Sequence, residues 1–182
     1  MISQQVAKKY SHALFALAKE RSLIDTAWDQ LNALADYLRK DRRFLDYMSA
    51  PQVSDEKKKA LIKAAFEKSL EKPFYDFLLF LLRKRRIGYL IDIVEAFDLR
   101  VRENKGIARA VCITAGKITD EERQKLIGQL AAKTSHTIEL VEKTDSSVIG
   151  GMIVMLQNQI VDGSIRHGLD QLRNRLMKVK VH

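Results

Sequence analysis

The sequence is poor in cysteine, proline and tryptophan, since its 182 residues include one cysteine, two prolines and one tryptophan. The single cysteine, Cys112, excludes an intrachain disulfide, and its apolar neighbours indicate a small buried side chain rather than a reactive thiol. The four histidines are isolated from one another along the chain. The sequence therefore offers no set of metal ligands, and we expect neither a metal nor a cofactor.

Long apolar runs are also missing. A membrane-spanning helix needs a run of about 18 or more apolar residues, and the longest candidate, Phe74 to Leu82, is too short and contains Asp76. The N-terminus carries a Lys8-Lys9 pair and lacks the apolar block and cleavage site of a secretory signal. We therefore expect membrane association only through a partner protein.

The fixed spacings that mark catalytic and nucleotide sites are missing too. Gly116-Lys117 lacks the glycine five residues earlier that a phosphate loop needs, and Gly150 and Gly151 lack the third glycine of a dinucleotide fingerprint. Asp145 and Asp162 are candidates for paired catalytic carboxylates, but turn and capping roles explain both more simply. We expect a protein that is not an enzyme.

Acidic residues are outnumbered, because 32 lysines and arginines face 23 aspartates and glutamates, for a net charge of +9. A basic helical chain is typical of a module that binds RNA or DNA, and this remains the alternative function. However, the excess is spread over both halves, and the run Arg83 to Arg86 falls at an expected helix end, where cations complement the helix dipole. A solvated basic surface is the simpler interpretation, and no nucleic acid is expected as a partner.

Residues 1–105 follow the apolar period of α-helices throughout. We expect six helices, which run from about Ser3 to Arg21, from Asp25, from Asp41, from Ser54, from Pro73 to Arg85 and from Tyr89 to Glu103. The short turns between them predict an all-α six-helix bundle.

Two of these helices have more apolar surface than one core face needs. The first carries two stripes. One is apolar and consists of Val6, Tyr10, Ala13, Leu14 and Leu17. The other is made mostly of small residues and consists of Ala7, Ser11, Phe15 and Ala18. Small side chains let another helix approach closely, and an internal neighbour is favoured over a foreign one. The fifth helix is apolar nearly all round, so it is either central in the bundle or half exposed for a partner.

After Asn104-Lys105-Gly106 the pattern changes to short strands and helices. We expect a strand over Ile107 to Thr114, a helix from about Thr119 to Thr134 and a strand over Thr137 to Glu142. A third strand and a last helix follow, so residues 106–182 predict a small β-α-β-β-α domain with two helices on a mixed or parallel sheet. The whole chain is then mainly α with a small α/β part.

The stretch from Asp145 to Leu176 is the only segment with several glycines at positions where the backbone is expected to turn or to approach a neighbour closely. Gly150-Gly151 precedes an apolar strand, Met152 to Leu156, and Asp162-Gly163-Ser164 then predicts a turn whose serine caps the last helix. That helix has Gly168 in its interior, which indicates tight packing on the sheet. Its apolar residues at helical spacing are Ile165, Leu169, Leu172, Leu176 and Val179.

This order of features resembles the C-terminal signature of the delta subunit of F-type ATP synthases, whose mitochondrial counterpart is the oligomycin-sensitivity-conferring protein. The signature positions here are Asp145, Gly150, Gly151, Asp162, Gly163 and Ser164. The start of the chain, Val6 to Tyr10 and Ala13 to Phe15, also looks like the opening helix of that family. A proline that often follows the first aspartate is replaced by Ser146.

The resemblance implies a non-catalytic stator subunit of the peripheral stalk, with no nucleotide site of its own, that resists rotor torque. Residues 1–105 would hold the N-terminal helices of the alpha subunits of the catalytic head, and residues 106–182 would bind the b-type stalk subunits. The protein would lie on the cytoplasmic face of the bacterial inner membrane.

The resemblance also places the alpha-binding groove between the first and fifth helices, here Ser3 to Arg21 and Pro73 to Arg85. The residues expected on its exposed wall are Ser11, Phe15, Ala18, Leu79 and Phe80.

Overall fold

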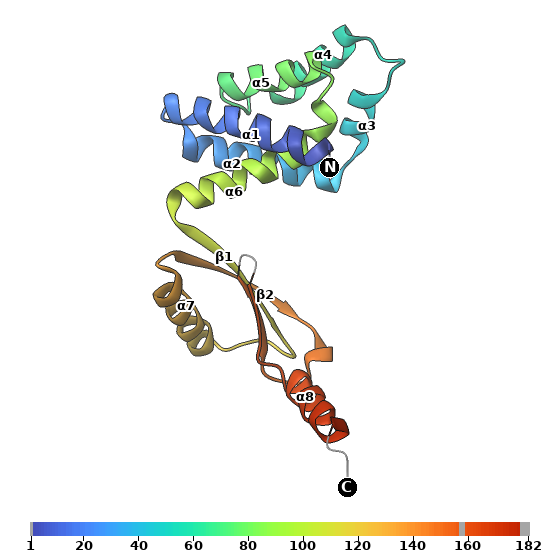
Figure 1. The fold of residues 1–182 in the computed structure, drawn as a ribbon. Coiled ribbons are helices and arrows are strands. Elements are labelled where there is room, and N and C mark those ends of the chain that lie inside the picture. Colours follow the sequence, from blue (N-terminus) through green and yellow to red (C-terminus); the bar gives the residue numbers. More distant parts are fainter. Residues whose placement is uncertain (1, 157–158, 179–182) are drawn as a thin grey trace. The chain divides into compact units, whose positions relative to one another are not determined.

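A computed structural model describes residues 2–156 and 159–178 of the chain. The chain divides into two compact units, Met1–Arg102 and Glu103–His182. Unit 1 is helical, and unit 2 contains a four-stranded sheet together with helices (Figure 1). The expectation of a mainly helical chain with a small mixed α/β part is confirmed.

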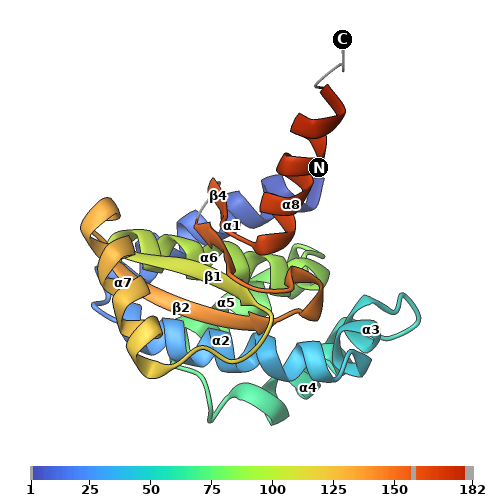
Figure 2. The ribbon, with the colours of Figure 1, turned by 90° about the horizontal axis from the view of Figure 1, so that it is seen from below.

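The helices of unit 1 share one hydrophobic core. They are α1 (Ile2–Glu20), α2 (Ile24–Lys40), α3 (Arg43–Ser49), α4 (Asp55–Phe66), α5 (Lys72–Arg83), the 3-10 helix η1 (Ile87–Tyr89) and α6 (Leu90–Lys105). The largest fully buried side chains come from five of them and include Leu14, Leu31, Ile62, Phe74 and Phe97. In both ribbon views α3 and α4 lie together at one end of the unit (Figures 1 and 2).

The small-residue stripe of α1 faces this core. Ala7, Ser11 and Ala18 are at most 5% exposed, whereas Val6 and Tyr10 remain partly exposed. Small side chains on the inner face leave room for the neighbouring helices to approach α1 closely. The internal-neighbour interpretation is therefore confirmed. In the stripe of larger side chains, Leu14 is fully buried, whereas Val6, Tyr10 and Leu17 lie at the edge of the core.

A polar cluster links α2 to α6. The carboxylate of Asp98 accepts hydrogen bonds from the Trp28 indole (2.6 Å), from the Arg102 guanidinium (2.7 Å) and from the Asn32 amide (3.4 Å). Arg102 also lies over the Trp28 ring, 5.3 Å from its centroid. Burial alone would raise the pKa of Asp98, but these donors outweigh it and hold the pKa below its usual value.

Replacing Asp98 with asparagine is expected to lower the free energy of unfolding by about 2 kcal/mol at neutral pH, because charge-assisted hydrogen bonds are lost. Since the folded-state pKa is lowered, the stabilisation is present above the unfolded pKa of about 3.9 and is lost as the pH falls through the folded value. Urea unfolding followed by Trp28 fluorescence at several pH values measures both effects. Asp36→Asn, which removes an exposed ion pair with Arg39, is the control and should change little.

Unit 2 is built on a sheet with strand order β2-β1-β3-β4. Its elements are β1 (Ile107–Thr114), α7 (Asp120–Thr134), β2 (Thr137–Thr144), the 3-10 helix η2 (Ser146–Val148), β3 (Met152–Leu156), β4 (Gln159–Asp162) and α8 (Ile165–Lys178). Strand β1 is parallel to β2 and antiparallel to β3, and β3 is antiparallel to β4. The α7 crossover between β1 and β2 makes the parallel pairing possible.

Helix α7 covers one face of this sheet. Its N-terminus has the predicted capping box, in which Thr119 and Glu122 exchange hydrogen bonds. The core beneath it contains Ala108, Ala110 and Cys112 from β1. Burial, and to a lesser degree the Glu142 charge, raise the pKa of the Cys112 thiol. The expected role of this cysteine as a small buried hydrophobe is confirmed.

Two expectations for unit 2 are wrong. First, the sheet has a fourth strand, β4, which the sequence pattern missed because it is only 4 residues long and has polar residues at both ends. Second, α8 does not cover the sheet, because every side chain from Ile165 to Met177 is exposed. A Cβ at Gly168 would meet nothing within 4 Å, so this glycine is not a packing residue. Val179 lies outside the described residues.

Candidate interaction surfaces

Helices α1 and α5 meet at a partly exposed aromatic pair. The ring centroids of Tyr10 and Phe80 lie 6.0 Å apart at a tilted angle, and both residues are only partly buried. Val6, one turn before Tyr10, and Leu79 are also partly exposed. We call these four residues the α1–α5 surface.

Basic side chains border this surface. The Arg83 guanidinium and the Lys84 ammonium each lie 5.9 Å from the centroid of the Phe80 ring, and Arg86 lies over Tyr89 at 5.8 Å. Cations over aromatic faces are attracted by the ring quadrupole. Part of the basic run is thus held against aromatic rings, and the α1–α5 surface combines an apolar centre with a positive rim.

Only some of the residues predicted for the exposed wall of the alpha-binding groove lie on this surface. Leu79 and Phe80 are on it, but Ser11 and Ala18 are 0% exposed, so the expectation that these two residues line an exposed wall is wrong. The physical reason is that the closest helix packing occurs where the side chains are smallest. The predicted contact residues do not include Tyr10, although it belongs to the stripe of larger apolar residues on α1.

Phe15 lies elsewhere on α1. At 100° per residue it is about 140° around the helix from Tyr10, and its ring packs against Phe97 of α6, with centroids 6.3 Å apart. Tyr10 and Phe15 therefore lie on opposite sides of the buried stripe that contains Ser11 and Ala18. The structure does not bring Phe15 together with Phe80.

The signature residues of unit 2 build two turns. Gly151 has a φ of +73°, and a Cβ there would overlap the carbonyl oxygen of Gly163. A Cβ at Gly150 would lie 2.8 Å from Cδ1 of Ile165. Ser164 caps α8, because its hydroxyl accepts a hydrogen bond of 3.1 Å from the backbone N–H of His167. Gly151 is therefore needed for a close approach between two backbone segments, whereas the Gly150 contact involves only the end of the flexible Ile165 side chain.

The two signature aspartates act within these turns. Asp145 accepts a hydrogen bond from the backbone N–H of Ser147, and Asp162 accepts one from that of Ser164, each at 2.9 Å. These hydrogen bonds lower the pKa of both carboxyl groups. Both are therefore ionised at neutral pH, and neither has the raised pKa of a general acid. The turn interpretation accounts for them better than a catalytic pair does.

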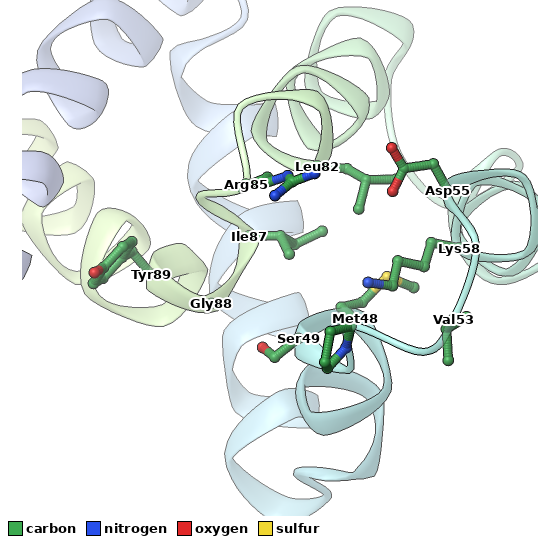
Figure 3. Close-up of a pocket in the computed structure, with 11 residues that line it drawn as sticks. Met48, Ser49, Val53, Asp55, Lys58, Leu82, Arg85, Ile87, Gly88 and Tyr89 are labelled. Carbon is green, nitrogen blue, oxygen red and sulfur yellow. The ribbon is translucent and has the colours of Figure 1, made fainter.

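A cavity of about 450 Å³ opens between α3, α4 and the α5–η1 turn (Figure 3). Met48, Lys58 and Ile87 point toward its interior. Lys58 is 7% exposed, and its ammonium donates a hydrogen bond of 2.7 Å to the carbonyl oxygen of Ala50. This contact ties α4 to the end of α3, so Lys58 has a structural role that its charge did not suggest.

The apolar residues of α8 and β4 face outward. Leu169, Leu172 and Leu176 are 54–65% exposed, and Ile160 and Val161 of β4 are 65% and 66% exposed. Exposed apolar residues this numerous on adjoining elements mark an interaction site. Unit 2 therefore carries a second apolar surface.

No helix within the described part of the chain is both long and apolar enough to cross a membrane.

The chain is similar to known proteins over most of its length. Residues 6–176 match the sequence model of the family described as ATP synthase delta (OSCP) subunit. The chain belongs to this family. It is thus a subunit of the peripheral stalk of an F-type ATP synthase, structural rather than catalytic, and it interacts with other subunits of that complex.

Relatives in this family span nearly the whole chain. ATP synthase subunit delta of Geobacillus sp. strain WCH70 is 34% identical and covers 97% of this chain and 99% of its own length. The delta subunit of Fusobacterium nucleatum is 33% identical over 95% of this chain and 99% of its own. A chain in a cryo-EM structure of the Toxoplasma gondii mitochondrial ATP synthase hexamer has the same fold, with a TM-score of 0.74 at 21% identity over 96% of this chain and 98% of that one.

Proposed function

We propose that the α1–α5 surface binds the N-terminal helix of an alpha subunit of the catalytic head, and that unit 2 binds the b-type stalk subunits. The chain then joins head to stalk and resists the torque of the rotor. We place it on the cytoplasmic face of the bacterial inner membrane, attached through these partners only.

The observation that carries the first contact is the partly exposed Tyr10–Phe80 pair with its basic rim. An amphipathic helix that lays its apolar face into a groove is a common mode of peptide recognition. Partly exposed aromatic side chains supply much of the binding energy in such contacts. Arg83 and Lys84 favour a partner helix with acidic residues beside its apolar stripe.

Phe80→Ser is expected to weaken binding of a synthetic alpha-subunit N-terminal peptide by about 10- to 100-fold, which corresponds to about 1.4 to 2.8 kcal/mol. The reason is that the mutation removes the aromatic contact area while the helix stays on the surface of the unit. Isothermal titration calorimetry with the full chain measures the affinity. Calorimetry is preferable to fluorescence here, because Trp28 is bonded to Asp98 between α2 and α6.

Tyr37→Ser is the matched control, since Tyr37 is an aromatic residue of α2 that is 58% exposed and lies outside the α1–α5 surface. It should leave the affinity unchanged. Circular dichroism verifies that both variants are folded. An unchanged affinity in Phe80→Ser, or no heat with the unmodified chain, would overturn the assignment of this surface.

A further inference from the structure

Helix α8 presents the described part of its apolar stripe to solvent. Ile165, Leu169, Leu172 and Leu176 are 52%, 55%, 54% and 65% exposed. Only the start of the helix is anchored, through the cap of Ser164 and a hydrogen bond of 2.9 Å from the Ile165 N–H to the Gly150 carbonyl. Beyond this turn, no described residue covers the stripe. A helix of 14 residues is marginal by itself in water, so α8 needs a partner to bury these side chains.

The spacing of the stripe fits one particular kind of partner. The four residues recur at intervals of four, three and four, which are the intervals of the two core positions in a coiled-coil heptad. A helix that packs on a sheet usually has a wider apolar face, with a third position filled in each heptad. The narrow stripe of α8 therefore suits a second helix, over a length of about 21 Å at 1.5 Å per residue.

The flanks of the stripe are basic on both sides. The flanking positions of a coiled coil lie directly beside its core positions. Arg166 and Arg173 directly follow the core residues Ile165 and Leu172, and Arg175 directly precedes the core residue Leu176. Gly168 occupies the remaining flanking position, and the one acidic residue of α8, Asp170, lies outside the flanks. Charges at these positions select the partner of a coiled coil. A second copy of the chain would oppose arginine with arginine or glycine, and like charges in such pairs are unfavourable.

We propose that α8 is one strand of a heterotypic coiled coil whose partner is a helix with apolar residues at heptad spacing and glutamate or aspartate at the positions facing Arg166, Arg173 and Arg175. This proposal rests on the proposed function only in that unit 2 is the stalk-binding unit. It adds the charge pattern and the length of the helix that docks there, and it rules out self-pairing through α8.

The test uses the full chain, labelled with ¹⁵N, and two synthetic helical peptides with the same leucine heptads. One peptide carries glutamate at the flanking positions and the other carries lysine. In an NMR titration the glutamate peptide is expected to shift the amide signals of residues 165–177 and to bind at least tenfold more tightly than the lysine peptide. Its binding should weaken as salt is raised, because the flanking pairs are exposed and screened.

Charge reversal sharpens the test. The triple variant Arg166→Glu, Arg173→Glu and Arg175→Glu is expected to exchange the preference and bind the lysine peptide. A control that reverses three exposed charges of unit 1, Arg42→Glu, Lys59→Glu and Lys68→Glu, changes the net charge equally and should keep the preference for the glutamate peptide. Leu169→Ser with Leu172→Ser should abolish binding of both peptides.

Equal shifts with both peptides, no shift with the glutamate peptide at millimolar concentration, or self-association of the unmodified chain through α8 would each overturn the proposal. An alpha-subunit peptide added to the same sample separates the two hypotheses. If that peptide shifts signals of the α1–α5 surface while α8 ignores the glutamate peptide, the head contact stands and the coiled-coil proposal fails. If the glutamate peptide shifts the signals of α8 while the alpha-subunit peptide shifts none on the α1–α5 surface, the coiled-coil proposal is supported and the head contact is overturned.

Discussion

Gly151→Ala is expected to destabilise unit 2 by about 3 kcal/mol or more, which is the range of mutations that strain a special backbone position. Two costs add at this residue. Its φ of +73° is unfavourable for any residue with a Cβ, and the new methyl group would overlap the carbonyl oxygen of Gly163. That oxygen belongs to the backbone, so the turn before α8 would have to move.

Amide hydrogen exchange of β1 and β3 measures this effect, because β3 begins directly after Gly151. Protection in these strands should fall sharply, while the unfolding transition seen by Trp28 in unit 1 should stay unchanged. Gly168→Ala is the matched control. Gly168 is a helical glycine with open space around its Cβ position, so alanine there is expected to stabilise α8 by up to about 1 kcal/mol. If Gly151→Ala left the protection of the β1 and β3 amides against hydrogen exchange intact, the close approach of Gly151 to the Gly163 carbonyl would not be structurally required.

Phe97→Ala is expected to lower the stability of unit 1 by about 3 to 5 kcal/mol. Phe97 is 0% exposed and is among the largest fully buried side chains. It lies on α6 and packs against Phe15 of α1, so its removal opens a cavity that rigid helices on several sides cannot close. The loss combines the transfer energy of the ring with the cost of that cavity.

Urea unfolding monitored by Trp28 fluorescence gives this value for unit 1. The comparison is Leu99→Ala on the same helix, where the side chain is 61% exposed and a change within about 0.5 kcal/mol is expected. A small effect of Phe97→Ala would mean that the core of unit 1 relaxes around the missing ring, and the central place of α6 would have to be reconsidered.

Local chemistry made several features predictable from the sequence. Ser54 caps α4, the Thr119 capping box opens α7, and Asp162-Gly163-Ser164 turns the chain into α8. Each of these features depends on contacts within about four residues, so the sequence contains the whole arrangement. The same local order in the last third of the chain also carried the resemblance to the delta family.

Contacts between distant residues were predictable only in part. The pattern on α1 indicated two apolar stripes, but it could not rank them, because the choice depends on which neighbouring helix approaches closest. The structure places Ser11 and Ala18 inside and leaves Tyr10 beside Phe80. Strand β4 was missed for a related reason, since a strand of 4 residues is stabilised mainly by its pairing with β3.

The sequence by itself determined the family, the main elements and the apolar stripe of α8, because helical period and turn chemistry are local. Only the tertiary structure decided that this stripe faces solvent. Periodicity states which side chains share a face of a helix, but their burial depends on what lies opposite, and one face of the sheet was already covered by α7. The stripe from Ile165 to Leu176, expected as core, therefore lies on the surface.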